Sequence, residues 1–129
     1  MNVSNDLQMS SKDIFIKDTL LSHAKLNIGL NIFDKTKNNY HIIESLIQEI
    51  NIKDIIKITI YKEEGDLKIS CKGMKINCSL EKNTCYQMAS YLKAHYNIEN
   101  RINIEINKKI PIGSGLGGGS SNAASILIF

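Results

Sequence analysis

Glycine, serine and proline are concentrated near the C-terminal end of this 129-residue chain, in the sequence PIGSGLGGGSS at residues 111–121. This segment holds five of the eight glycines and the only proline. Glycine reaches positive φ and lets the backbone approach a ligand closely, so successive N–H groups can converge on an anion. Serine hydroxyls add further donors. We therefore predict a phosphate-binding loop formed by Pro111, Ile112, Gly113, Ser114, Gly115, Leu116, Gly117, Gly118, Gly119, Ser120 and Ser121.

A helix is predicted to begin directly after this loop. The sequence SNAASILIF at residues 121–129 favours a helix, of which about two turns are present. A phosphate held by the loop would then lie at a helix N-terminus, where unpaired N–H groups and the helix dipole favour negative charge. We also expect an exposed apolar surface at residues 126–129, where further structure would pack.

Three other kinds of glycine loop match the segment less well. Residues 113–118 satisfy G-x-G-x-x-G, but a dinucleotide-binding loop follows a continuously apolar strand, whereas residues 101–107 alternate. A Walker A loop requires a lysine after its last glycine. A protein-kinase glycine loop requires a following strand, where Ala123 and Ala124 favour a helix. A glycine-rich loop without a ligand stays open as the structural alternative.

The segments that position the loop are mostly strands. Residues 21–33 alternate as a half-buried strand, followed by a polar loop at residues 34–39. One face of that strand carries Leu26, Ile28, Leu30 and Ile32, and the other carries Lys25, Asn27, Gly29 and Asn31. Residues 55–61 and 66–71 predict an antiparallel pair joined at residues 63–65.

Two further segments complete the predicted α+β order, in which strands are interrupted by a helix. Residues 83–96 predict a helix with Asn83 or Thr84 as N-cap, and residues 101–107 predict a strand. Residues 41–50 are ambiguous, because their apolar spacing slightly favours a helix while their β-branched content suits a strand. Lys108 and Lys109 are interpreted as a solvated charge pair, and His23 and His95 as structural residues.

Composition limits the class of protein. The length allows one domain, and the polar composition of residues 1–18 predicts a mobile tail. A net charge of +3 does not indicate a nucleic-acid partner, and no apolar run suits a membrane span or a leader, so we expect a cytoplasmic protein. Cys71, Cys78 and Cys85 have no metal-binding spacing and are expected to be reduced thiols.

Residues 111–124 resemble the central ATP-binding motif of the GHMP kinases, P-x-x-x-G-L-G-S/G-S/G-S/A. The longer match GGGSSNAA, the sequence AKLNI at residues 24–28 and the pair Tyr40-His41 are similar to one group of the family. That group phosphorylates the 2-hydroxyl of a cytidine diphosphate derivative of methylerythritol in the non-mevalonate isoprenoid pathway. The resemblance covers residues 20 to 129 and implies a strand at residues 41–50.

The resemblance also implies a fold and roles for particular residues. The fold would be the N-terminal GHMP-kinase domain, similar to domain 2 of ribosomal protein S5, truncated, over residues 19–129. ATP and Mg²⁺ would be the cofactors, Lys25 a catalytic residue at the transferred phosphate, and Asn27 a ligand of the substrate hydroxyl. Tyr40 would stack on the cytosine and His41 would hydrogen-bond its edge.

The chain departs from the family pattern at three places. His23 stands where the family often has proline, and Asn38-Asn39 replace Asp-Gly before Tyr40. Asn39, like the glycine that it replaces, can adopt positive φ. The family's later G-x-D-V-P segment, which carries the catalytic aspartate, and its C-terminal domain have no counterpart in these 129 residues. A truncated, non-catalytic remnant with at most weak nucleotide binding is therefore the alternative to a functional kinase.

Overall fold

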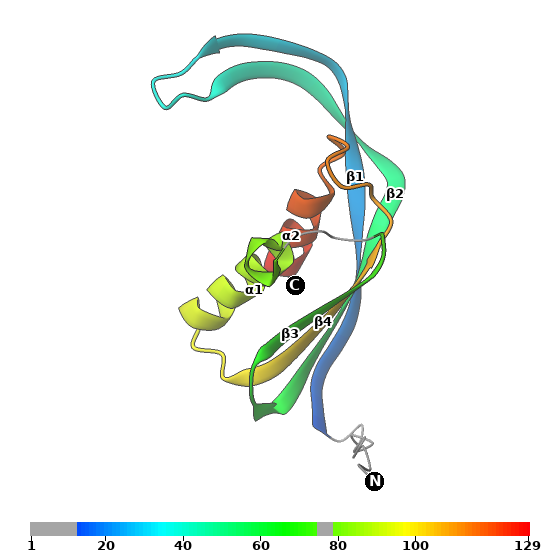
Figure 1. Ribbon diagram of the computed structural model, residues 1–129, viewed down its shortest axis with the longest axis vertical. Coiled ribbons are helices and arrows are strands. Elements are labelled where there is room, and N and C mark those ends of the chain that lie inside the picture. The colour runs from blue at the N-terminus through cyan, green and yellow to red at the C-terminus, as the bar shows by residue number, and fades with distance from the viewer. Residues whose placement is uncertain (1–12, 75–78) are drawn as a thin grey trace.

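The computed structural model describes residues 13–74 and 79–129, which form a four-stranded sheet with two α-helices on one of its faces (Figure 1). The elements in chain order are β1 (Ile14–Lys35), β2 (His41–Glu64), β3 (Leu67–Gly73), the short 3-10 helix η2 (Leu80–Lys82), α1 (Thr84–His95), β4 (Asn100–Lys108) and α2 (Gly118–Ile128). The α+β class predicted from the sequence is confirmed.

The strand order is β1-β2-β4-β3, so β4 lies between β2 and β3. β2 and β4 pair antiparallel, whereas β3 and β4 pair parallel across the connection through α1. The predicted direct pairing of residues 55–61 with 66–71 is therefore wrong, although the two strands do run in opposite directions. Alternation along a strand predicts which side chains share a face, but it does not specify which strand lies beside it.

Isoleucine side chains from the central strands form the core under the helices. The buried cluster consists of Ile56, Ile58, Cys85, Ala89, Ile102, Ile104, Ile106 and Ile126. Ile126 in α2 is only 5% exposed, so the expected apolar surface at residues 126–129 is restricted to Leu127, Ile128 and Phe129. Because both helices pack on the same face of the sheet, the start of α2 is held above the end of β4.

The predicted helix and the adjoining strand are confirmed. Asn83 is the N-cap of α1, and its side-chain oxygen accepts hydrogen bonds from the N–H groups of Cys85 and Tyr86 at 2.9 and 3.3 Å. Residues 41–50, which remained ambiguous by periodicity, are part of β2. Within residues 13–74 and 79–129, no helix is both long and apolar enough to cross a membrane.

β1 and β2 extend beyond the rest of the sheet as a two-stranded arm, which curves toward the side on which the helices lie (Figure 1). Most of its side chains are exposed, and the predicted buried face is wrong, because Leu26, Ile28, Leu30 and Ile32 are 47–62% exposed. A bulge at Gly29, with φ of 67°, shifts the register between Ile28 and Leu30. One inserted residue moves Leu30 and Ile32 to the face that carries Lys25 and Asn27.

The N-terminal prediction is partly wrong. β1 begins at Ile14, so residues 14–18 of the predicted tail belong to a strand that pairs with β2. Residues 1–12 and Cys78 lie outside the described residues. The predicted polar loop after β1 is confirmed as a turn between Lys35 and His41, and Asn39 adopts the positive φ, at 65°, that asparagine tolerates.

Candidate functional site

The glycine loop connects β4 to α2 and contains three glycines with positive φ. The φ angles of Gly113, Gly115 and Gly117 are 72°, 75° and 72°. Alternation of left-handed residues with their neighbours turns successive N–H groups to one side of the chain, and this concave arrangement binds anions. Within the loop, the Ser114 hydroxyl donates to the carbonyl of Pro111 at 2.7 Å, which tightens the turn.

α2 begins inside the glycine segment, three residues before the predicted position. Gly117 is the N-cap in the left-handed conformation, and Gly118, Gly119 and Ser120 form the first turn. The first N–H groups of a helix have no partner within it. The N-terminal end of α2 therefore combines three flexible glycine positions with unpaired donors, which is the arrangement that favours a phosphate group.

Lys25 of β1 lies against this loop. Its ammonium Nζ donates to the carbonyl of Gly115 at 2.7 Å and to Oδ1 of Asn27 at 3.3 Å, and its backbone N–H donates to the carbonyl of Leu116 at 3.0 Å. The structure thus brings Lys25 and Asn27 together with the glycine loop, which lies about 90 positions later in the sequence.

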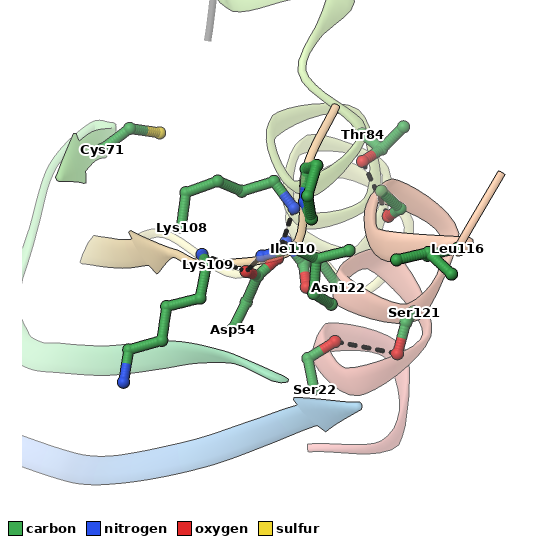
Figure 2. Close-up of polar contacts among 12 residues, drawn as sticks. Ser22, Asp54, Cys71, Thr84, Lys108, Lys109, Ile110, Leu116, Ser121 and Asn122 are labelled. Atoms are coloured by element: carbon green, nitrogen blue, oxygen red, sulfur yellow. Dashed lines mark hydrogen bonds and ion pairs between the residues drawn. The ribbon is translucent and has the colours of Figure 1, made fainter. Parts of the chain in front are cut away.

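Ser121 and Ser120 differ in what their side chains contact. The hydroxyl of Ser121 donates to the carbonyl of His23 at 2.7 Å and accepts from the hydroxyl of Ser22 at 2.9 Å, so it fastens α2 to β1 (Figure 2). Ser120 is exposed and lines a pocket beside the loop. Of the two serines, Ser120 has the hydroxyl that is accessible to a ligand.

That pocket has a volume of about 350 Å³ and lies between the N-terminal ends of α1 and α2. Its residues include Lys82, Asn83 and Thr84 on one side and the glycine loop on the other. The hydroxyl of Thr84 donates to the carbonyl of Gly119 at 2.9 Å, which holds the two helix ends together (Figure 2). Two helix N-termini and the Lys82 ammonium make the pocket favourable for a negatively charged group.

A buried polar cluster that sequence reasoning missed lies below the loop. Asp54 of β2 is 0% exposed and pairs with Lys108, which is 5% exposed and whose Nζ lies 2.5 Å from Oδ2 of Asp54. The interpretation of Lys108 as part of a solvated charge pair is therefore wrong, although Lys109 is exposed. Asn122 of α2, at 3% exposed, also donates to Asp54.

The cluster keeps Asp54 ionised. Burial by itself would raise the pKa of this carboxyl, but hydrogen bonds from the Ile110 N–H, the Lys108 ammonium, the Lys109 N–H and the Asn122 amide outweigh it and hold the pKa below its usual value. The sequence contains a signal for this pairing only in retrospect: Asp54 takes the place of an isoleucine in the alternating series Ile52, Ile56 and Ile58 of β2.

Comparison with known proteins relates the chain to the GHMP kinases. The family described as "GHMP kinases N terminal domain" matches residues 83–129. A 4-diphosphocytidyl-2-C-methyl-D-erythritol kinase of Fusobacterium nucleatum is 39% identical over 112 residues, which cover 86% of this chain and 38% of that protein. The kinase of the same name from Clostridioides difficile is 37% identical over 110 residues, 84% of this chain and 36% of the relative. Residues 83–129 thus match the N-terminal domain of the GHMP kinases, and most of the chain is similar to these two kinases.

Solved GHMP kinases share the fold. The crystal structure of a 4-(cytidine 5'-diphospho)-2C-methyl-D-erythritol kinase superposes with a TM-score of 0.67 at 28% identity, over 86% of this chain and 38% of that one. Homoserine kinase from Cytophaga hutchinsonii gives 0.59 at 20% identity, over 93% and 35%, and supports the fold alone. The chain spans between a third and two fifths of the length of these relatives.

Two residues predicted from the GHMP resemblance lie away from the loop. Tyr40, 77% exposed, and His41 are at the tip of the arm, where His41 pairs with Lys35. Lys35 is ten residues along β1 from Lys25, which corresponds to roughly 30 Å of strand. The described residues therefore do not bring Tyr40 and His41 together with Lys25, although the arm curves toward the helix side of the sheet.

No metal centre is formed by the described residues alone. Among residues 13–74 and 79–129, no group of three or more His, Cys, Asp and Glu side chains is arranged to hold a metal ion. A Mg²⁺ ion in phosphoryl transfer does not require such a cluster, because it is commonly bound through one or two carboxylates and the phosphates themselves.

Proposed function

We propose that this chain forms the nucleotide-binding part of a kinase that transfers the γ-phosphate of ATP to the 2-hydroxyl of 4-diphosphocytidyl-2-C-methyl-D-erythritol. The observation that carries the proposal is the glycine loop, in which three glycines with positive φ lead into the N-terminus of α2 while the ammonium of Lys25 contacts the same loop. The names of the relatives supply the substrate.

ATP would occupy the pocket between the two helix ends, with its phosphates on the N–H groups of the loop and of α2. The terminal phosphate would extend past Gly115, which lines the pocket, toward Lys25, whose ammonium contacts the Gly115 carbonyl but does not itself line the pocket. A lysine there neutralises charge on the transferred group and stabilises it during transfer. Mg²⁺ bound with ATP would neutralise further charge on the phosphates.

The acceptor would approach Lys25 along the face of β1 that also carries Asn27. The Asn27 side chain, 3.3 Å from Lys25 Nζ, can hydrogen-bond the hydroxyl end of the substrate. For Tyr40 and His41 to bind the cytosine of the same substrate, the curved arm would have to bring its tip closer to Lys25 than the roughly 30 Å of strand between Lys25 and Lys35. The base that accepts the hydroxyl proton is expected from the G-x-D-V-P segment of the family, so we expect negligible turnover by these 129 residues alone.

ATP binding by the purified chain tests the proposal, with two glycine variants that are matched in backbone strain. Gly115 in the loop and Gly29 in the arm have φ of 75° and 67°, and a Cβ at either would meet nothing within 4 Å. Gly115→Ala should weaken ATP binding by about tenfold because it shifts the loop out of the left-handed conformation, whereas Gly29→Ala should leave it unchanged.

Isothermal titration with ATP and Mg²⁺ measures this difference, and protection of the loop from proteolysis by ATP is an independent measurement. Absence of ATP binding by the wild-type chain, or equal weakening in both variants, would contradict the proposal. Binding without phosphoryl transfer is the result expected of the chain by itself. Turnover of order 1 to 10³ s⁻¹ would show instead that its own residues supply the base.

A further inference from the structure

The buried cluster of Asp54, Lys108 and Asn122 has no role in the site as described so far. Asp54 and Lys108 are charged side chains that are 0% and 5% exposed, and burial of charge is unfavourable unless every charge is paired and hydrogen-bonded. Apolar residues of similar volume often stabilise a core at least as well as an ion pair. The position of the cluster in the fold therefore requires an explanation beyond stability.

Both oxygens of the Asp54 carboxylate are used, and their partners come from either side of the glycine loop (Figure 2). Oδ1 accepts from the N–H groups of Lys109 and Ile110 at 2.6 and 2.8 Å. Oδ2 accepts from Lys108 Nζ and from the side-chain amide of Asn122, the latter at 2.9 Å. One side chain of β2 thus holds the residues that precede Pro111 and a residue in the first turns of α2.

The loop between these two anchors has little structure of its own. Glycine-rich segments sample many conformations, so a defined anion-binding shape requires that both ends be fixed. Asp54 fixes them with respect to the same strand. Lys25 and Ser121 tie the loop and α2 to β1, which is paired with β2 at Ser22 and Asp54.

The amide of Asn122 provides a second observation. A carboxylate only accepts hydrogen bonds, so the NH₂ group of Asn122 must face Asp54 and its Oδ1 must point elsewhere. This Oδ1 is buried and has no hydrogen-bond partner within the described part of the chain, and Asn122 lines the pocket together with Lys108. An unpaired buried acceptor is unfavourable in a purely structural cluster, but it suits a group that receives a donor from a ligand.

We propose that Asp54 is a positioning residue of the nucleotide site. It fixes both ends of the glycine loop and orients Asn122 so that its Oδ1 accepts a hydrogen bond from a ribose hydroxyl or the adenine amino group, the donors of the bound nucleotide. This inference rests on the proposed function for the identity of the ligand. The effect of Asp54 on the shape of the loop does not depend on the proposed function, because the hydrogen bonds of Asp54 form without any ligand.

Asp54→Asn tests the role of the carboxylate, with Ile58→Val as the matched control. The asparagine has the same shape but no charge, and on either side its NH₂ group faces a donor, because all four partners of the Asp54 carboxylate donate hydrogen bonds. Ile58 lies on the same strand, is 2% exposed and belongs to the core. Ile58→Val therefore lowers the stability of the fold without removing a contact to the glycine loop. Stability is measured by urea unfolding, and the binding experiments are done where both variants are folded.

We expect Asp54→Asn to speed amide hydrogen exchange at the ends of the loop by about tenfold or more, at the hydrogen-bonded N–H groups of Lys25, Lys109, Ile110 and Ser121. The Kd for ATP should rise by a similar factor. Ile58→Val should change neither by more than about twofold. If Asp54→Asn does not fold, the double variant Asp54→Asn/Lys108→Met, which removes both charges, is measured by the same criteria.

Loop exchange and ATP affinity that change no more in the Asp54 variant than in Ile58→Val would overturn the proposal. If the wild-type chain binds no ATP, the proposed function fails, but the exchange experiment still decides whether Asp54 holds the loop. Faster loop exchange with an unchanged Kd would refute the link to nucleotide binding and leave only an effect on loop structure.

Discussion

Replacement of Gly118 by alanine would place a methyl group where the structure has no room for it. A Cβ at this buried position would lie 2.8 Å from Cγ2 of Ile110 and 2.8 Å from Nζ of Lys108. Neither neighbour can move away easily, because Ile110 is 0% exposed and Lys108 is paired with Asp54. The adjacent Gly119 is a close control, since its Cβ would meet Thr84 Oγ1 at 3.4 Å, an ordinary contact distance.

The expected magnitudes follow from these distances. Overpacking of this kind costs about 1 to 3 kcal/mol, and the higher helix propensity of alanine returns at most about 1 kcal/mol at the first turn of α2. We therefore expect Gly118→Ala to lower the free energy of unfolding by about 1 to 2 kcal/mol. Gly119→Ala should be neutral or raise it by up to about 1 kcal/mol.

Urea unfolding followed by circular dichroism measures both variants against the wild type. A difference of about 2 kcal/mol between them exceeds the uncertainty of such measurements when their slopes agree. Equal stabilities of the two variants, or a more stable Gly118→Ala, would refute the conclusion that Lys108 and Ile110 close the space at the start of α2.

Three further predictions concern single side chains. Burial raises the pKa of the Cys85 thiol to about 12. In a variant with serine at positions 71 and 78, this thiol should therefore react with a disulfide reagent at pH 8 roughly 10³-fold more slowly than an exposed thiol. Reaction at the rate of an exposed thiol would contradict the burial of Cys85. The pKa of Asp54 is lower in the folded than in the unfolded chain, so its contribution to stability should be complete above about pH 4, the unfolded value, and be lost as the pH falls through the folded value. Urea unfolding between pH 7 and 2 should show a smaller acid loss in Asp54→Asn, and identical profiles would disprove this. Lys25→Met should raise the Kd for ATP by about 5- to 50-fold because it removes the ammonium at Gly115, whereas Lys57→Met, on the exposed outer face of the sheet, should have no effect in the same titration.

Local features of the candidate site could be predicted from the sequence because their causes are local. Glycines at alternate positions are needed for positive φ, and Gly113, Gly115 and Gly117 adopt it. Asn83 caps α1 because its side chain reaches the N–H groups two and three residues later. Strand β4 was predicted within a residue at each end, since its alternation is clean. The resemblance of residues 24–28 to the GHMP kinases indicates Lys25 as a site residue from the sequence alone.

The remaining features depend on residues that are distant along the chain. Lys108 is 54 positions from Asp54, and no periodicity predicts that a lysine at the end of a strand will be buried beside a carboxylate. Alternation specified the faces of β2 and β3 but not that β4 lies between them. The bulge at Gly29 reversed the faces of Leu30 and Ile32, because one extra residue in a strand changes the side of the sheet on which every following side chain lies.

The sequence by itself determined the glycine loop, the N-cap of α1, the main strands and the family resemblance, because these follow from the conformations and hydrogen bonds of neighbouring residues. Only the tertiary structure decided that Lys25 lies on the loop, that Ser121 fastens α2 to β1 and that Asp54 holds both ends of the glycine segment. Those contacts join residues on different strands and helices, so they exist only after the sheet has assembled and the two helices have packed on its face.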